Sequence, residues 1–481
     1  MAEFSPMMQH YLSTKEEYKD CILFYRLGDF YEMFFDDAVT VSKELELSLT
    51  GKDCGEHETA PMCGVPFHAA EGYINRLVAN GHKVAICEQM EDPKQAKGIV
   101  KREVIRVVTP GTNLNSQALD ETKNNYLFCI YYQGDVIGVS ICDFSTGDYY
   151  VTELKNENEL LDEINKFVPS EIIVNDYFAM SGIDLTSVND KLGISMSALE
   201  NWYFDEDSCI RRLLSHFKLN SLDGLGVKDY PTGVIAAGAL LTYLYETQKS
   251  DMSHIITLTP YTTGKYMLID SSSRRNLELV ETLREKQKRG SLIWVLDKTK
   301  TAMGARALRS MLEQPLIDRE QIILRQDVIA ELSEHQIDRE ELREYLNPIY
   351  DLERLMTKIS CKSANPRDLI AFRNSLRMLP YIKQIIGIFQ SELFRKYFDS
   401  LDDLRDIYSL IDSAIVEEPP ITMREGGMIK EGFSAEADEL KKAKTEGREW
   451  LAQLEERERA NTGIKNLRIK YNKVFGYYLE V

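Results

Sequence analysis

The sequence predicts a multidomain protein of α/β plus α class. It comprises a small mixed α/β domain, a second α/β domain, a helical core with a long helix, and the start of a β-structured segment. Its 481 residues exceed what one hydrophobic core usually serves, so several domains are expected. Strand-like and helix-like patterns alternate through the first half of the chain, whereas long helical periods fill the second half. The fold class follows from this change of pattern.

The first α/β domain is expected to span residues 1 to 115. Short apolar runs predict its strands, and a segment of helical period that ends at Asn80-Gly81 predicts a helix. These elements are strands at residues 21 to 27, 82 to 87 and 104 to 108, and a helix at residues 69 to 78. Pro110-Gly111 interrupts the pattern, so we place a linker at residues 116 to 125.

The second α/β domain is expected at residues 126 to 250, and it begins as a meander of short strands. Glycine-containing turns at residues 133 to 135 and 145 to 147 separate the strands and indicate antiparallel hairpins. The predicted elements are strands at residues 126 to 132, 136 to 144 and 148 to 154, a helix at 156 to 167, a strand at 171 to 174 and a helix-rich tail to 245.

Long segments of helical period predict a helical core at residues 251 to 430. The clearest segments are residues 292 to 312, 319 to 346, 352 to 361 and 368 to 389. Residues 431 to 463 hold many charges and few apolar positions, which predicts a projecting helix that Gly463 ends. Residues 464 to 481 alternate like a strand or hairpin, and since a strand needs partners, we expect the natural protein to continue past residue 481.

Composition excludes several classes of protein. No run approaches the roughly 20 apolar residues of a membrane span, and the N-terminus has no export signal. The 8 cysteines form no C-x-x-C pair, so they are expected as reduced core residues rather than disulfides or zinc ligands. We therefore expect a cytoplasmic protein with no membrane partner. A net charge of −19 predicts that any nucleic-acid binding is confined to a local surface.

The segment at residues 24 to 34 carries the most informative pattern. Phe30 and Glu32 are two residues apart, so in an extended strand their side chains project to the same side. An aromatic wedge can stack on a base and kink a duplex, and unstacking costs least where pairing is already defective. The carboxylate repels phosphates and can form one hydrogen bond to a displaced base, in a protonation state that the sequence leaves open. The alternative is that Phe30 packs in a core and Glu32 is a solvated surface acid.

Four blocks follow one another in the first domain. They read Phe24-Tyr-Arg-Leu-Gly-Asp-Phe-Tyr-Glu32, Pro61-Met-Cys-Gly-Val-Pro-Phe-His68, Val84-Ala-Ile-Cys-Glu-Gln89 and Val107-Val-Thr-Pro-Gly-Thr112. Together they resemble the mismatch-recognition domain of the bacterial MutS family. Residues 269 to 279 resemble the start of that family's core domain, and residues 471 to 478 resemble its clamp, so the resemblance covers the whole chain.

The resemblance implies binding of double-stranded DNA with mismatches or small loops in DNA mismatch repair, with Phe30 and Glu32 as the mismatch readers. It implies recognition, connector, core and lever, and clamp regions, with the clamp cut short at residue 481. For full-length members it implies a homodimer, downstream repair proteins as partners, a location at the bacterial nucleoid, and an ATPase that uses ATP and Mg²⁺.

No enzyme activity, cofactor or metal site is expected in this chain itself. The G-x-x-x-x-G-K-S/T phosphate loop of the family's ATPase does not occur in it. The Gly-Lys pairs at residues 51 to 52 and 264 to 265 lack the rest of the motif, so both are interpreted as ordinary turns.

A local basic patch is the second candidate site. Lys465, Arg468, Lys470 and Lys473 alternate with aromatic residues, and no acid lies between residues 463 and 478. Such cations can neutralise the phosphates of any duplex, which suits the DNA-backbone contacts of a clamp. The alternative is a solvated strand face. A weaker basic group is diluted by acids and consists of Lys94, Lys97, Lys101, Arg102 and Arg106.

Three further hypotheses stay open. Phe67 and His68 either lie near the minor groove beside the mismatch reader, or form a rigid turn with Phe67 packed inward. The second domain resembles a ribonuclease-H-like arrangement, and a metal-dependent nuclease would bind Mg²⁺ through Asp135, Asp143 and Asp148. Against this, Asp is common beside turns for structural reasons. The last hypothesis is a protein-interaction scaffold without DNA binding of its own.

Overall fold

The computed structural model describes residues 4–55, 58–91, 100–115, 117–186, 192–262, 264, 266–420, 423–472 and 476–481. Its contacts divide the chain into two compact units. The first unit consists of Met1–Ala364 and Tyr381–Leu401, and the second consists of Asn365–Pro380 and Asp402–Val481. The domain boundaries expected from the sequence stay predictions.

The first sheet of the first unit has six strands in the order β3-β4-β2-β1-β5-β6. The strands are β1 (Cys21–Leu27), β2 (Phe30–Phe34), β3 (Thr50–Gly55), β4 (Glu58–Pro66), β5 (Lys83–Gln89) and β6 (Arg102–Val108). Strands β1 and β5 are parallel, and the other neighbours are antiparallel. The strands predicted from apolar runs are thus confirmed as β1, β5 and β6.

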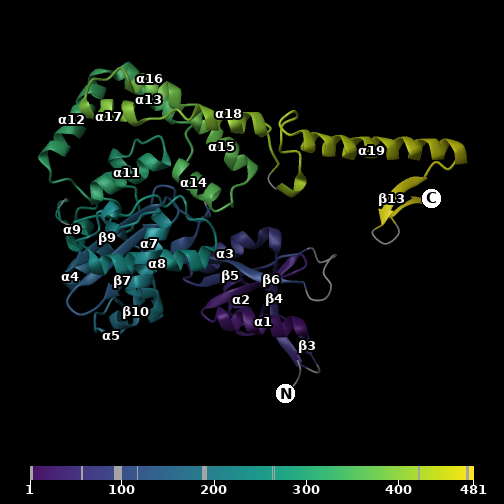
Figure 1. Ribbon diagram of the computed structural model, residues 1–481, viewed down its shortest axis with the longest axis horizontal. Helices are drawn as coiled ribbons and strands as arrows, with labels where there is room; N and C mark the ends of the chain where they lie inside the picture. Colours follow the sequence, from purple (N-terminus) through teal and green to yellow (C-terminus); the bar gives the residue numbers. More distant parts are fainter. Residues whose placement is uncertain are drawn as a thin grey trace. The chain divides into compact units, whose positions relative to one another are not determined.

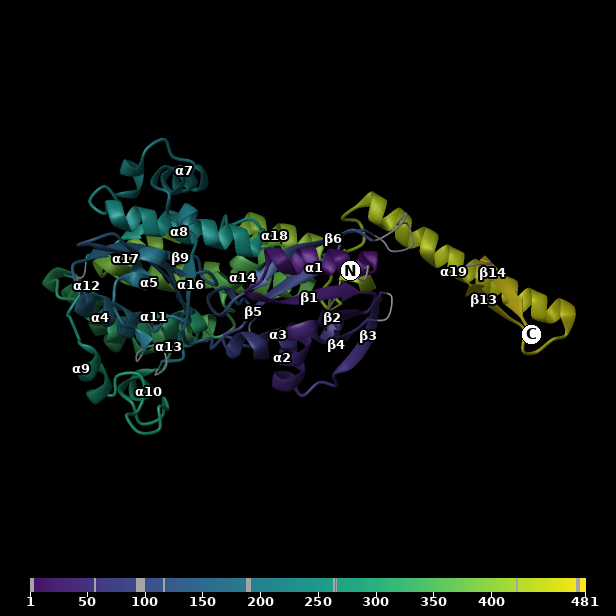
Figure 2. The same cartoon turned by 90° about the horizontal axis from the view of Figure 1, so that it is seen from below.

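Helices cover both faces of this sheet (Figure 2). They are α1 (Pro6–Glu17), α2 (Phe35–Leu45) and α3 (Ala70–Ala79), the last of which was predicted. Helix α1 packs against the face that carries Phe34, whereas α2 and α3 cover the face that carries Tyr31 and Met33. Because side chains alternate along a strand, Glu32 lies on the same face as Phe34.

The second sheet also has six strands, in the order β11-β10-β7-β8-β9-β12. The strands are β7 (Leu127–Tyr132), β8 (Ile137–Asp143), β9 (Asp148–Leu154), β10 (Glu171–Asn175), β11 (Ser195–Leu199) and β12 (Thr259–Pro260). Strands β7, β8 and β9 form the predicted antiparallel meander. Strand β10 runs parallel to β7, and β11, where the sequence predicts only a helix-rich tail, runs parallel to β10.

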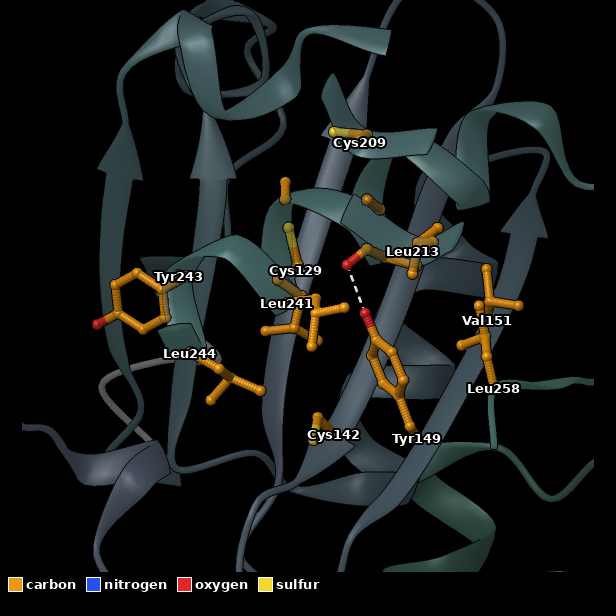
Figure 3. Close-up of a cluster of buried hydrophobic side chains, with 14 of the residues drawn as sticks. Cys129, Cys142, Tyr149, Val151, Cys209, Leu213, Leu241, Tyr243, Leu244 and Leu258 are labelled. Carbon is orange, nitrogen blue, oxygen red and sulfur yellow. Dashed lines mark hydrogen bonds between the residues drawn. The ribbon is translucent and has the colours of Figure 1, made fainter. Parts of the chain in front are cut away.

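Helix α8 (Pro231–Gln248) packs on one face of the second sheet with α7 (Glu206–Phe217) on its other side (Figure 2), and α4 (Glu157–Phe167) and α5 (Asp176–Met180) cover the opposite face. Helix α8 is apolar on nearly all sides, as a helix buried between two layers must be. The hydroxyl of Tyr149 on β9 donates a hydrogen bond to the carbonyl of Ala237 on α8 (Figure 3).

Seven of the eight cysteines are buried as predicted, several of them in this core, while Cys361 is half-buried.

The other helices of the first unit are α9 (Ser271–Asn276), α10 (Leu292–Leu296), α11 (Ala302–Glu313), α12 (Arg319–Glu334), α13 (Gln336–Leu346), α14 (Leu352–Ser360) and α17 (Glu392–Ser400). Helix α16 (Leu379–Ile386) begins at the edge of the second unit. Short 3-10 helices are η1 (Phe67–Ala69), η2 (Pro110–Thr112), η3 (Asn201–Phe204), η4 (Leu222–Leu225) and η6 (Met423–Glu425). None of the described helices is long and apolar enough to cross a membrane.

Three of the predicted helical segments are interrupted, so their expected continuity is wrong. In the segment at residues 368 to 389, a turn at residues 377–378 separates α16 from the helix before it. Between α10 and α11, Asp297 accepts hydrogen bonds from the N–H and hydroxyl of Thr299 at 3.1 and 2.6 Å. Such a side-chain turn competes with helix, and Thr301 then begins α11 by accepting from the N–H of Gly304. Between α12 and α13, His335 leaves helical geometry with φ −98° and ψ 64°.

The second unit contains α15 (Pro366–Leu376), α18 (Arg405–Ala414), α19 (Ala435–Thr462), β13 (Arg468–Asn472) and β14 (Gly476–Glu480). The long charged helix is confirmed as α19, and Gly463 ends it with φ +70°. Strands β13 and β14 form an antiparallel hairpin at the end of α19 (Figure 1). Arg459 donates to the carbonyl of Leu467 at 2.7 Å, and Glu455 accepts from the N–H of Ile469 at 2.8 Å, which fixes the hairpin to the helix.

Candidate nucleic-acid interface

A tight turn between β1 and β2 places Phe30 at the start of a central strand. Leu27 of β1 pairs with Phe30 of β2, so Gly28 and Asp29 alone form the turn. Gly28 has φ +57°, the left-handed geometry that two-residue hairpins favour. Phe30 is 46 % exposed, so the alternative that places it in the core is wrong.

Glu32 lies on the same face of β2 as Phe30, as its spacing predicts, and it is paired with a cation. Lys52 of β3 donates a hydrogen bond from Nζ to Oε2 of Glu32. The Glu32 side chain is only 16 % exposed, and that of Lys52 is 31 % exposed. The alternative of a freely solvated surface acid is therefore wrong for Glu32.

Lys52 is the residue of this site that the sequence pattern misses. The interpretation of Gly51 and Lys52 as an ordinary turn is wrong, because both lie in β3, which pairs with β4. The Lys52 ammonium also lies 5.6 Å from the ring centroid of Phe34, within the range of a cation–π interaction. Lys52 and Glu32 are 20 residues apart, so only the pairing of β3, β4 and β2 brings them together.

Phe67 and His68 lie in η1, directly after β4. The N–H of Phe67 donates to the carbonyl of Asp29 at 3.0 Å, which ties this segment to the β1–β2 turn. The Arg26 guanidinium lies 3.8 Å from the centroid of the Phe67 ring, and the ring packs against the core under α2 and α3. This geometry favours the inward-packed alternative for Phe67, whereas His68 is exposed.

Three of the four predicted clamp cations are described, and each is exposed: Lys465, Arg468 and Lys470. Lys473 lies outside the described residues. Although no acid interrupts this stretch of sequence, Glu480 of β14 reaches Lys470 across the hairpin at 2.5 Å. This hydrogen-bonded ion pair raises the pKa of Lys470. The pairing of the strands therefore neutralises a cation that the linear sequence leaves free.

The hairpin separates its cations from its best-defined aromatic pair. Lys470 is paired with Tyr478, and Tyr471 is paired with Tyr477. Because successive strand residues face opposite sides, Arg468 and Lys470 lie on one face and the Tyr471–Tyr477 pair lies on the other. The two tyrosine rings meet edge to face, with centroids 5.0 Å apart. Arg468 and Lys470 therefore share a face with Tyr478 rather than with Tyr471 and Tyr477.

The weaker basic group predicted in the first domain does not form one surface in the described residues. Arg102 is buried and donates to the carbonyl of Arg26 at 2.8 Å. Arg106 donates to Gln248 at 3.1 Å, and Lys101 forms an exposed ion pair with an adjacent acid, Glu103. The other two members, Lys94 and Lys97, lie outside the described residues.

The three aspartates of the nuclease hypothesis lie in different surroundings. Asp143 is fully buried and accepts from the N–H and hydroxyl of Ser145 at 2.8 and 2.7 Å, and from Asn124 at 2.8 Å. Burial and the charge of Asp143 raise the pKa of Asp148, while Asp135 is exposed in the β7–β8 connection. In the part of the chain that the structure describes, no three His, Cys, Asp or Glu residues could hold a metal ion together.

A cavity of about 580 Å³ lies elsewhere in the first unit, beside α4 and α11. Its wall includes several cations, but most already have partners. Lys166 pairs with Glu163 at 3.1 Å, Arg306 with Asp351 at 2.6 Å and Arg309 with Glu313 at 3.5 Å. The cavity thus offers an anion far less free positive charge than its residue types suggest.

Three family models match successive parts of the chain. MutS domain I matches residues 5–117, MutS domain II matches residues 125–256, and MutS domain III matches residues 272–472. The DNA mismatch repair protein MutS of Lachnoclostridium phytofermentans is 63% identical over 481 residues, which are 100% of this chain and 52% of that protein.

The proteins of the same name from Ruminiclostridium cellulolyticum and Acetivibrio thermocellus are each 50% identical over 484 residues, again over 100% of this chain and 55% of each relative. The chain therefore spans about half the length of the curated relatives it matches.

Proposed function

The chain belongs to the MutS family of DNA mismatch repair proteins, and on that basis we propose that it binds mismatched or looped double-stranded DNA through Phe30 and Glu32. Phe30 wedges beside the mispaired base, and Glu32 hydrogen-bonds that base. A wedge unstacks a defective base step at lower cost than a paired one, so this contact selects by the deformability of the duplex.

The observation that carries this proposal is the exposure of Phe30 beside a carboxylate that is mostly covered. A large aromatic ring directly after a two-residue turn can enter a groove, because much of the ring is exposed. Because β2 has a paired strand on each side, the backbone that carries the Phe30 ring is held in place. Rigid support matters because a reader placed on a strand keeps its geometry better than one on a loop.

Further roles belong to the same proposal. Lys465, Arg468, Lys470 and Lys473 contact the phosphate backbone, with Lys470 less effective because Glu480 pairs with it. The second domain is ribonuclease-H-like, which its antiparallel meander followed by parallel strands supports, and α19 is a lever between core and clamp. Phe67 supports the β1–β2 turn, and His68 lies close to DNA.

The cofactors and protein partners that the MutS family implies are proposed for the longer proteins. ATP and Mg²⁺ bind a domain of those proteins, and this chain alone hydrolyses no ATP. Homodimers act on DNA in the bacterial cytoplasm at the nucleoid and engage downstream repair proteins.

The test is a fluorescence-anisotropy titration of a G·T-mismatched duplex and its matched control at two salt concentrations. Phe30→Ala should weaken binding to the mismatched duplex by about 1 to 3 kcal/mol, the cost of lost stacking on a base, and abolish the preference. Tyr177→Ala, which removes an exposed ring of α5, is the control that should change neither titration. Higher salt should weaken both duplexes, because phosphate contacts release counterions.

The other outcomes decide between the alternatives. If neither duplex binds, the chain is a protein-interaction scaffold without DNA binding of its own. If both duplexes bind equally and Phe30→Ala changes nothing, Phe30 is not the mismatch reader.

A further inference from the structure

The ion pair between Lys52 and Glu32 uses only one of the two carboxylate oxygens of Glu32. Lys52 occupies Oε2, and Oε1 has no hydrogen-bond partner among the residues that the structure describes. Across the strand pair, Glu32 faces Gly64, where an added Cβ would lie 3.5 Å from Cγ of Glu32. No side chain at position 64 therefore covers the carboxylate, and one oxygen is held in place for a further partner.

Lys52 is itself fixed by two contacts. Its ammonium binds Glu32 and lies 5.6 Å from the ring centroid of Phe34. Phe34 is almost fully buried and packs edge to face on Tyr11, with ring centroids 4.9 Å apart. The cation is thus anchored on a rigid aromatic residue of the core rather than on a mobile loop.

The positive charge of Lys52 also changes the net charge that this site presents to DNA. The edges of bases in the minor groove present mainly hydrogen-bond acceptors, and the phosphates around them are anionic. A lone carboxylate beside them is repelled, whereas a carboxylate that shares an ammonium carries almost no net charge at a distance. The pair therefore lets Glu32 approach a duplex while Oε1 stays available.

We propose that Lys52 is a positioning residue for mismatch reading, which holds the Glu32 carboxylate in one rotamer and cancels its charge. This inference rests on the proposed function of Phe30 and Glu32. It predicts that Lys52 acts through Glu32, so the effects of removing the two residues are not additive. A lysine that instead bound a phosphate directly would act independently of Glu32 and equally on every duplex.

The experiment measures the mismatch preference, which is the Kd for the matched duplex divided by that for the G·T duplex, with the whole chain. Lys52→Met should lower the preference roughly 3- to 30-fold, which matches the interaction energies measured between residues in direct contact. Lys52→Arg keeps the positive charge and should retain most of the preference. In a Glu32→Ala background, Lys52→Met should change the preference less than about twofold. Lys43→Met removes an exposed lysine of α2 and should have no effect on the preference.

Equal loss of affinity for both duplexes after Lys52→Met, in either background, would overturn the inference and identify a phosphate contact instead. A preference that Lys52→Met leaves intact would overturn it as well. In both cases the Phe30→Ala result still decides the proposed function on its own.

A measurement without DNA tests the geometry separately. The rate at which acetic anhydride modifies Lys52, followed by mass spectrometry, should rise several-fold in Glu32→Ala, because a hydrogen-bonded ammonium reacts slowly. The rate at Lys43 should not change. If the rate at Lys52 is the same in both proteins, the ion pair does not form and the inference fails, whether or not the chain prefers mismatches.

Discussion

At the scale of the residue, His254 shows how burial sets a protonation state. Its Nε2 donates to the carbonyl of Phe144 at 3.0 Å, while Nδ1 is buried without a hydrogen-bond partner among the described residues. Burial lowers the pKa of His254 to about 4. A proton on Nδ1 would place a charge on a buried atom that has no hydrogen-bond partner among the described residues.

His254 therefore predicts acid sensitivity of the second domain. The unfolded imidazole has a pKa near 6.5, so unfolding takes up a proton as the pH falls below that value. The contribution of His254 to the free energy of unfolding is fully present above pH 6.5 and is lost as the pH falls toward 4, by up to roughly 3 kcal/mol. Chemical denaturation at pH 7 and pH 5 should show a smaller difference for His254→Phe than for the parent chain. His68→Asn, at an exposed ring, should leave the difference unchanged, and equal differences for all three would contradict the prediction.

Single residues of the candidate site differ in how far the sequence predicts them. The spacing of Phe30 and Glu32 predicts their common side, because alternation depends only on an extended backbone. The partner of Glu32 is not predictable in the same way, since Lys52 lies on a strand that is not adjacent to β2. Glu480 is a similar case, because the hairpin register sets it opposite Arg468 and so within diagonal reach of Lys470, with which it pairs.

At the scale of the element, α8 depends on two close approaches that only glycine permits. A Cβ at Gly138 of β8 would lie 2.3 Å from the carbonyl oxygen of Thr232. A Cβ at Gly238 would lie 2.3 Å from Cβ and 2.5 Å from Cα of Cys209 on α7. The three layers of sheet, α8 and α7 thus touch through backbone at these points.

Gly238→Ala should consequently separate α7 from α8 and destabilise the second domain by about 1 to 3 kcal/mol or more, the usual cost of overpacking. Thermal unfolding measures this directly. Gly72→Ala on α3 is the matched control, because a Cβ there meets nothing within 4 Å and alanine favours helix, so it should be neutral or stabilising by about 0.5 to 1 kcal/mol. Similar melting temperatures for the two variants would show that the helices shift without cost.

The elements that the sequence predicts best are those whose local signals agree. Strand β9 matches its predicted bounds because a turn ends β8 just before it, and α19 ends at the glycine that predicts its end. Strands β3 and β4 lack a continuous apolar run, and pairing with β2 rather than local composition determines them. The break at His335 has no strong local signal, since helical periodicity continues on both sides of it.

At the scale of the whole molecule, Glu171 joins the regions that match MutS domains I and II. It is fully buried on β10 and accepts from the hydroxyl of Thr109 at 2.5 Å, the N–H of Gly111 at 3.0 Å and the hydroxyl of Tyr243 at 2.7 Å. Lys83 of β5 approaches it to 3.9 Å. One carboxylate thereby fixes the segment that leaves the first sheet to the core of the second.

Replacing this carboxylate should loosen the connection between the two regions. Glu171→Gln puts an amide N–H₂ where the neighbours are donors, so at least one buried group loses its partner, at a cost of about 1 to 3 kcal/mol. We expect a lower melting temperature and faster proteolysis between β6 and β7. Glu246→Gln, at an exposed position of α8, should change neither quantity. If Glu171→Gln behaves like Glu246→Gln, the two regions are held together by other contacts.

The length of α19 has a mechanical consequence. With 28 residues it extends about 42 Å, and no described side chain along it is buried. A tilt of about 5° at its first turn moves its last turn sideways by about 4 Å, close to the rise of one base pair. The helix thus converts a small rotation into a displacement at the hairpin, and its bending stiffness determines how faithfully that displacement is transmitted.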